Sequence, residues 1–364
     1  MRTVSLPFYA RLALILLSVV LVCLILALAK NIFIPLVFAL LIAILLYPVN
    51  NFFERRLRMG KATAAITSVM LFITVFVAFI YFLAVQIIGF ADDFPQLRVR
   101  FQEMLDSVRH WFSYKLHING RQQDEYINQS VNGSLESIGN SLSNVVVSVT
   151  GTLLLTVFVL IFTFFILYHR RLLLRFVLHL FKIPHREKVR EVIVESKSMI
   201  NAYVLGLVIE MAILSVVNSA LLMIIGIKYA LLLGVMAAVL NIIPYLGIYV
   251  SIVICMLVTF ANNSAGMAMQ VGVGLFVIHL LDSNILFPQI IGGRVKMNPF
   301  ITIVAVIVGE FLWGIPGMFL FIPITGIIKL ISERVEGMEA WGILIGVEEH
   351  EKPRRRKKIS IPKD

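Results

Sequence analysis

The chain contains few charged residues: 15% of its 364 residues are Asp, Glu, Lys or Arg, while 59% are hydrophobic. About a quarter of the residues of an average soluble domain are charged. The mean hydropathy of +0.93 is correspondingly high. This composition excludes an ordinary soluble globular protein and predicts a polytopic membrane protein.

Cysteine is also scarce, and both cysteines, Cys23 and Cys255, lie inside apolar runs away from any CxxC or Cys/His cluster. We therefore expect no disulfide framework and no metal site. The sequence has no P-loop, no H-E-x-x-H and no G-x-S-x-G motif. These absences predict that the protein is not an enzyme and has no catalytic residues and no cofactor, so that any transport it performs is secondary.

Long apolar runs without charge are abundant, and a run of about 20 residues can cross the roughly 30 Å bilayer core. Because a helix satisfies its own backbone hydrogen bonds in lipid, we predict an all-α polytopic membrane protein with about eight transmembrane helical segments. The first run ends in Ala27-Leu28-Ala29, which resembles a signal-peptidase site. The length of this run and the span that follows it at once favour retention as half of a membrane hairpin. The predicted crossings are 12–29, 32–49, 62–88, 145–168, 201–225 and 266–281.

The net charge of +11 can be explained by the membrane topology, because the basic residues gather in loops on one face of the membrane. One threading puts most Lys and Arg residues on a single face, in the N-terminus, the turn after the second span, the 170–197 connection and the C-terminal tail. Basic loops stay in the cytoplasm, so both termini are expected there, and no nucleic-acid partner is needed to explain the charge. Within the connection, Arg171, Arg175, His179 and Lys182 recur at helical spacing beside apolar residues, which predicts a basic interfacial helix on anionic headgroups rather than a partner-binding helix.

Two apolar stretches in the C-terminal half are interrupted by proline and glycine. In 230–261 the break contains Pro244, Tyr245 and Gly247, and in 300–331 it contains Gly314, Pro316 and Gly317. A break leaves backbone polar groups unpaired, which lipid does not tolerate, and paired breaks are typical of the substrate site of a transporter. The stretches form either two re-entrant hairpins that enter from opposite faces or two kinked full crossings.

Polar residues near these breaks are candidates for a substrate or ion pathway, since burying them in lipid is costly. The acidic candidates are Glu210, Asp282 and Glu310, and Asn241 and Asn284 could supply neutral hydrogen bonds. Each carboxylate either carries a coupling proton or contacts substrate, or else forms a structural hydrogen bond between helices. Helix N-termini exposed by the breaks suit an anionic or hydroxyl-rich solute.

Several motifs follow one another in a specific order: Asn241-Ile-Ile-Pro244-Tyr245-Leu-Gly247, Asp282-Ser-Asn284-Ile-Leu-Phe-Pro288-Gln-Ile-Ile-Gly292, Asn298-Pro299, Leu312-Trp313-Gly314-Ile-Pro-Gly317-Met318 and Ile322-Pro323. Over residues 203–346 this set resembles the autoinducer-2 exporter family, the PerM-like permeases. Some members are assigned autoinducer-2 export and others sodium/proton antiport. Glu310 and Tyr249 depart from the family pattern. The residues on motif positions are Pro244, Gly247, Asp282, Asn284, Pro288, Gly314 and Gly317.

The resemblance implies a homo-oligomeric permease of the bacterial inner membrane. We expect a secondary transporter that exports a small polar metabolite or signal by alternating access, driven by protons or sodium. The alternatives are a cation (sodium)/proton antiporter and, from another class, a membrane scaffold. The expected partners are the lipid bilayer, a small-molecule or ion substrate and further copies of the chain.

The expected organisation has five parts. Residues 1–88 hold three spans, and 89–144 form an extracytoplasmic loop of two amphipathic helices that turns at Asn119-Gly120. This loop is a lid, an oligomer contact or an outer gate. Residues 145–198 hold the fourth span and the basic helices, 199–332 form the transport core, and 333–364 form a basic cytoplasmic tail.

Overall fold

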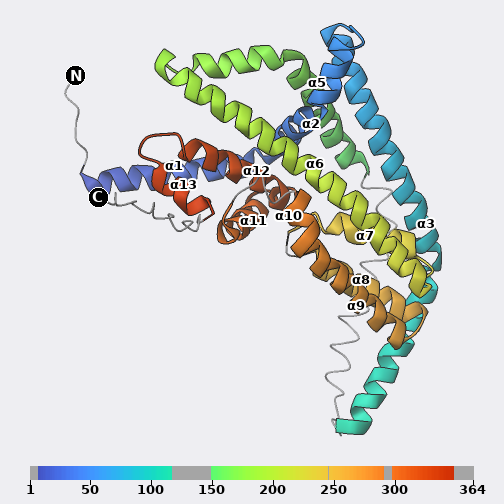
Figure 1. Ribbon diagram of the computed structural model, residues 1–364. Helices are drawn as coiled ribbons and strands as arrows, with labels where there is room; N and C mark the ends of the chain where they lie inside the picture. Colours follow the sequence, from blue (N-terminus) through green and yellow to red (C-terminus); the bar gives the residue numbers. More distant parts are fainter. Residues whose placement is uncertain (1–6, 117–148, 245, 291–296, 348–364) are drawn as a thin grey trace, which may run out of the picture.

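The computed structural model describes residues 7–116, 149–244, 246–290 and 297–347, and within these ranges the chain is helical and contains no strand. Short connections include a 3-10 turn at Ile183–His185 and a π-helical turn at Asp282–Leu286. The expected all-α polytopic fold is confirmed (Figure 1). The helices are α1 (Phe8–Leu28), α2 (Lys30–Arg55), α3 (Lys61–Leu116), α5 (Val149–His179), α6 (Arg186–Ile225), α7 (Ala230–Leu240), α8 (Gly247–Asn262), α9 (Ala265–Leu281), α10 (Phe287–Ile290), α11 (Pro299–Trp313), α12 (Ile315–Ser332) and α13 (Glu339–Ile345).

Seven helical stretches in the described residues are long and apolar enough to cross a membrane. They include all six crossings expected from the apolar runs. The seventh, Ile315–Ser332, is the second half of the second broken segment. The seven stretches are Phe8–Leu28, Lys30–Arg55, Lys61–Phe90, Leu155–His179, Ile183–Ile225, Ala265–Ile290 and Ile315–Ser332.

Two helices extend well beyond the spans expected for them. Helix α3 has 56 residues, about 84 Å at 1.5 Å per residue, so the third span and the first amphipathic helix of the 89–144 loop form one continuous helix. The expected turn at Asn119-Gly120 and the second amphipathic helix lie outside the described residues. Helix α5 likewise continues through the basic stretch as far as His179, so this stretch is the end of the fourth span's helix rather than a separate one.

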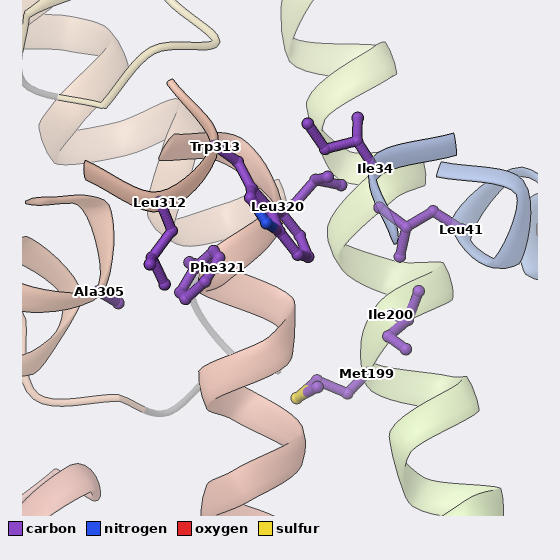
Figure 2. Packing of buried hydrophobic residues seen from close by; sticks show 9 residues of the cluster. All are labelled: Ile34, Leu41, Met199, Ile200, Ala305, Leu312, Trp313, Leu320 and Phe321. Atoms are coloured by element: carbon purple, nitrogen blue, oxygen red, sulfur yellow. The ribbon is translucent and has the colours of Figure 1, made fainter. Parts of the chain in front are cut away.

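The core is formed by helices from both ends of the chain (Figure 2). The indole Nε1–H of Trp313, at the end of α11, donates to the backbone oxygen of Leu26 near the end of α1, at 3.0 Å. Apart from this end, α1 buries no residue. The core cluster brings together side chains of α2, α6, α11 and α12: Ile34, Leu41, Met199, Ile200, Ala305, Leu312, Trp313, Leu320 and Phe321.

Both broken stretches fold back as helical hairpins. Helices α7 and α8 have 11 and 16 residues, about 16 and 24 Å, which is shorter than the roughly 30 Å bilayer core. At the first break a Cβ on Gly247 would overlap the backbone oxygen of Leu240, and at the second the backbones of Gly309 and Gly317 touch. This geometry agrees with the hairpin alternative, although α12, with 18 residues, is itself long enough to cross.

Candidate functional site

Three polar residues from distant parts of the chain meet at the first break. Glu210 lies within α6, Asn241 directly follows α7, and Asp282 directly follows α9. The Asn241 side-chain Nδ2 donates to Glu210 Oε1 and to Asp282 Oδ2, both at 3.3 Å. Both acidic residues are only 5% exposed. The structure therefore joins three sequence-predicted candidates into one buried cluster, which we call the carboxylate pair with its bridging amide.

Local packing brings these three residues together. Helix α6 buries the face that carries Glu210, Leu214 and Asn218. Helix α7 approaches this helix closely through Gly234, where a Cβ would lie 2.5 Å from the backbone nitrogen of Ser219. On the other side, α9 ends in the π-helical turn that begins at Asp282. A π-helical turn adds a residue to the helix and changes the direction of the side chains at that point, and such turns are frequent at functional sites.

Two carboxylate oxygens of the cluster could bind a proton or a cation. Glu210 Oε2 and Asp282 Oδ1 are buried, and neither has a hydrogen-bond partner among the described residues. In that part of the chain no Lys or Arg forms an ion pair with either group. Two buried carboxylates joined by one neutral amide repel each other, and an uncompensated buried charge is strongly destabilising. A proton or a cation bound between them would relieve both costs.

Further polar side chains lie close to Asp282. The ring of His279, one turn before Asp282, contacts the ring of Tyr249 with centroids 6.3 Å apart. Its Nε2 lies 3.4 Å from Ser283 Oγ, while its Nδ1 is buried without a partner among the described residues. Within those residues no group of three or more His, Cys, Asp or Glu side chains could hold a metal ion. The unpartnered atoms of the carboxylate pair are carboxylate oxygens, which suit a proton or a hard monovalent cation.

The other described candidates near the first break have contacts or exposure of their own. Gly247 is packed against Leu240, and Pro244 lies in the connection between them. The Asn284 side chain is exposed and donates to the backbone oxygen of Leu280 at 2.7 Å. Pro288 is exposed in α10. Tyr245 lies outside the described residues.

The second break is closed by backbone packing rather than by polar side chains. Gly314 has φ +66°, a conformation that glycine adopts easily, and Pro316 lies in the first turn of α12. Glu310 is exposed, and its side chain makes no hydrogen bond or ion pair with the described residues. The structure therefore does not bring Glu310 to the carboxylate pair.

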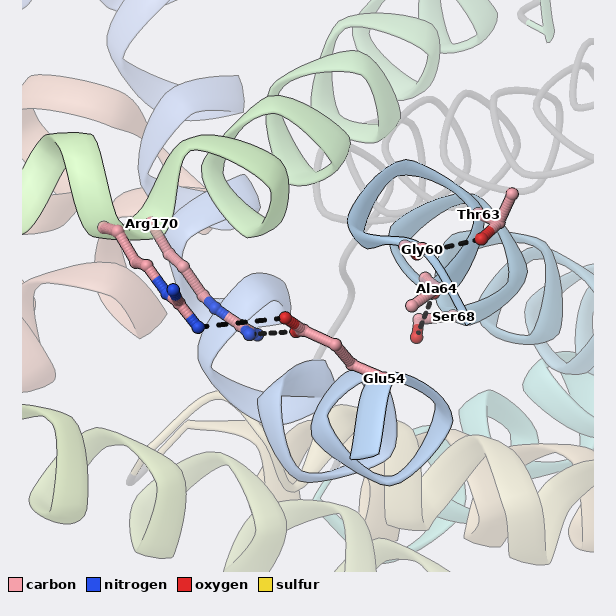
Figure 3. A network of polar contacts seen from close by, with 7 residues as sticks. Glu54, Gly60, Thr63, Ala64, Ser68 and Arg170 are labelled. Carbon is pink, nitrogen blue, oxygen red and sulfur yellow. Dashed lines mark hydrogen bonds and ion pairs between the residues drawn. The ribbon is translucent and has the colours of Figure 1, made fainter. Parts of the chain in front are cut away.

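A second polar cluster was not singled out from the sequence. Glu54, at the end of α2, pairs with Arg170 and lies 4.0 Å from Arg171 (Figure 3). The Arg170 guanidinium carbon lies 5.2 Å from the centre of the Tyr47 ring, and Lys197 Nζ lies 3.0 Å from the same centre. These contacts join the ends of α2, α5 and α6. The signal that could have identified the cluster is that Glu54 is the single acidic residue in 1–88.

Several known proteins are similar in sequence to this chain. YrrI of Bacillus subtilis is 24% identical over 317 residues, which cover 83% of this chain and 86% of YrrI. YhhT of Escherichia coli K12 is 31% identical over 121 residues, 33% of this chain and 35% of YhhT. The AI-2 transport protein TqsA of the same organism is 28% identical over 126 residues, 35% of this chain and 37% of TqsA.

The family described as AI-2E family transporter matches residues 14–337, a range that holds all the core spans and both breaks. The matched range also includes the carboxylate pair with its bridging amide. The chain therefore belongs to the AI-2E family of transporters and is a multi-pass membrane protein.

Proposed function

We propose that the protein is a secondary transporter that exports a small polar metabolite or signal across a bacterial inner membrane, coupled to protons or sodium, with both termini in the cytoplasm. The observation that carries the proposal is the contact of Asn241 with both Glu210 and Asp282. Two buried carboxylates with unpartnered oxygens form a site for a coupling ion.

The place of Asn241 in the fold suggests how ion binding moves the protein. Asn241 lies at the tip of the α7–α8 hairpin, while the two carboxylates belong to α6 and α9. With a proton or sodium ion bound, the site is neutralised and the tip is held between the two helices. When the ion leaves, repulsion between Glu210 and Asp282 favours separation of the helices from the tip. The charge state of the pair is thereby coupled to the position of the hairpin, as alternating access requires.

The helix break beside the carboxylate pair supports the proposal that the transported solute is polar. The segment between Asn241 and Gly247 interrupts the helix beside the carboxylate pair, and a break of this kind is typical of the substrate site of a transporter. TqsA is named an AI-2 transport protein. Autoinducer-2 is therefore the first solute to test with this chain.

A second candidate function, cation (sodium)/proton antiport, is supported by the same pair. One proton and one sodium ion could compete for Glu210 and Asp282 without any organic solute. In this case the hairpin would move in response to the exchanged ion alone. Exporter and antiporter differ in whether solute flux accompanies ion flux.

The experiment is a flux assay in proteoliposomes with imposed proton and sodium gradients and with autoinducer-2 as the solute. Glu210→Gln, Asp282→Asn and Asn241→Ala should each lower flux about tenfold or more, since a hydrogen bond to a charged group contributes about 1.5–3 kcal/mol. Glu191→Gln is the matched control, because Glu191 is an exposed carboxylate of the same helix α6, far along the chain from Glu210.

The outcomes separate the candidates. Solute flux that depends on the pair supports the exporter. Proton exchange for sodium without solute flux supports the antiporter. If folded wild type moves neither, or if Pro244→Ala and Gly247→Ala leave the cellular function intact, the membrane scaffold becomes the better explanation.

We also infer that several copies of the chain assemble. Glu310 lies on the exposed face of α11 beside Phe311, which is 84% exposed, and a carboxylate facing lipid is costly. A second copy that covers this face would shield Glu310 from lipid. A cysteine at Phe311 should then give disulfide-linked dimers in membranes of a variant with Cys23 and Cys255 replaced, and exclusively monomeric protein would contradict this inference.

A further inference from the structure

The connection between α5 and α6 forms a shallow cavity that is largely open at the surface. We call residues 179–186 the α5–α6 elbow. A cavity of about 530 Å³ lies at this elbow. Its basic lining residues are His179, Lys182 and Arg186, and its apolar lining residues are Leu180, Phe181, Ile183 and Pro184.

Internal hydrogen bonds hold the elbow in this shape. The Arg186 Nε–H donates to the backbone oxygen of Phe181 at 3.2 Å. His179 Nδ1 lies 2.7 Å from the backbone oxygen of Arg175, and the His185 N–H donates to the backbone oxygen of Lys182 at 3.0 Å. Pro184 lies in the first turn of the 3-10 helix, where its fixed φ is favourable. The basic groups are therefore presented by a constrained turn.

The cations of the elbow remain available to bind an anion. Neither Lys182 nor Arg186 forms an ion pair with a carboxylate in the described part of the chain. This differs from Lys188, four residues after Pro184, which pairs with Glu336 at 3.3 Å. Within the described residues, the elbow thus presents two cations, Lys182 and Arg186, that form no ion pair with a carboxylate.

Large apolar side chains are exposed directly beside these cations. Ile183 is 77% exposed, and Phe176, Leu180 and Phe181 are also exposed. The elbow and the end of α5 lie along the upper edge of Figure 1, at the same end of the molecule as the basic turn between α2 and α3. The positive-inside rule assigns this end to the cytoplasm. Apolar anchors beside cations at this level are typical of a segment that lies in the lipid interface.

We propose that the α5–α6 elbow binds an anionic phospholipid of the cytoplasmic leaflet. Lys182 and Arg186 contact the headgroup phosphate, and His179 lies at the rim of the same cavity. Leu180, Phe181 and Ile183 contact the upper part of the acyl chains. A soluble phosphate compound would use the cations but leave the apolar side chains exposed, so a lipid fits the whole surface better. This site is independent of the proposed transport function.

The test measures bound lipid on the full chain by native mass spectrometry after extraction from membranes of equal phosphatidylglycerol and phosphatidylcholine content. Wild type should retain phosphatidylglycerol in preference to phosphatidylcholine. Lys182→Gln combined with Arg186→Gln should lower this preference on the order of tenfold, since each basic residue near an anionic surface contributes about 1 kcal/mol. Arg190→Gln is the matched control, because Arg190 is an exposed cation of α6 outside the cavity.

Three results would overturn the proposal. The first is equal retention of both lipids by wild type, and the second is an unchanged preference in the double variant. The third is displacement of lipid by millimolar inorganic phosphate together with an unaltered preference in Leu180→Ser and Ile183→Ser, which would assign the cavity to a soluble anion. Circular dichroism and the unfolding midpoint of each variant show whether it is folded.

Discussion

At the scale of single residues, the second hairpin depends on two glycines that touch. Gly309 in α11 and Gly317 in α12 bring their backbones into contact, which allows Trp313 and Phe321 to pack edge to face with centroids 5.2 Å apart. Glycine is required here for close approach rather than for an unusual φ. Neither residue has a positive φ.

Gly317→Ala should therefore destabilise the protein. The new Cβ would overlap the Gly309 oxygen and lie 3.0 Å from Trp313 Cβ. Overpacking of this kind costs about 1–3 kcal/mol, so the unfolding midpoint followed by tryptophan fluorescence in detergent should fall. Gly89→Ala is the control, because nothing lies within 4 Å of a Cβ there; equal midpoints for the two variants would refute the packing argument.

At this scale the sequence identified candidate residues but did not show how they meet. Glu210, Asn241 and Asp282 stand out because polar groups are rare in apolar runs. Their mutual contact depends on the hairpin fold and on the π-helical turn, which are tertiary features without a sequence pattern of their own. Glu310 had the same sequence signal as Glu210, yet it lies on an exposed face.

At the scale of elements, the ends of α2, α5 and α6 are joined by the cluster around Glu54. The side chains of Glu54 and Arg170 are only 16% and 20% exposed, so water screens their pairing poorly. Loss of one partner leaves a largely buried charge with fewer hydrogen bonds. The Tyr47 ring lies between this pair and Lys197.

Glu54→Gln should lower stability by about 1–3 kcal/mol, because it leaves Arg170 and the nearby Arg171 without their carboxylate. The charge-reversed double variant Glu54→Arg with Arg170→Glu should recover part of this loss. Thermal unfolding of the single and double variants in the same detergent gives a double-mutant cycle, which measures the interaction free energy between the two residues. Additive losses would show that the pair does not act as a unit.

The lengths of elements were predictable only in part. The apolar runs marked the spans, because hydrocarbon thickness sets their length. They did not show that α3 would continue to Leu116 through Pro95, since proline normally interrupts a helix. Similarly, α7 and α8 were recognisable as halves of a broken segment, but the contact between Gly247 and Leu240 that folds them together was not.

At the scale of the whole molecule, α6 contributes residues to three regions: the α5–α6 elbow, the hydrophobic core and the carboxylate pair. Its first turn contributes to the elbow, its middle packs in the core through Met199 and Ile200, and farther along it carries Glu210. Arg334, after α12, pairs with Glu195 of α6 at 2.5 Å, and Lys188 pairs with Glu336. The second hairpin is thus attached to the helix that carries one of the two buried carboxylates.

Arg334→Gln should have little effect on stability but should change the coupling between these parts. Arg334 is 23% exposed and Glu195 is 48% exposed. Water therefore screens this pair more than it screens Glu54 and Arg170, and we expect its contribution to be near 1 kcal/mol, the upper end for surface ion pairs. We expect an unfolding midpoint within a few degrees of wild type, together with a flux that is altered at low salt and approaches wild type at high salt, where screening weakens the pair in both proteins. A large loss of stability would show instead that Arg334 is a structural residue.

The exposed first helix has a consequence for biosynthesis. Because α1 buries no residue fully and packs against the core only through partly buried side chains, those of Cys23, Leu26 and Ala27, its insertion into the bilayer needs no partner helix. Its apolar side chains alone supply the insertion free energy as it leaves the ribosome. Helix α1 can therefore be in the bilayer before the core cluster of α2, α6, α11 and α12 has assembled.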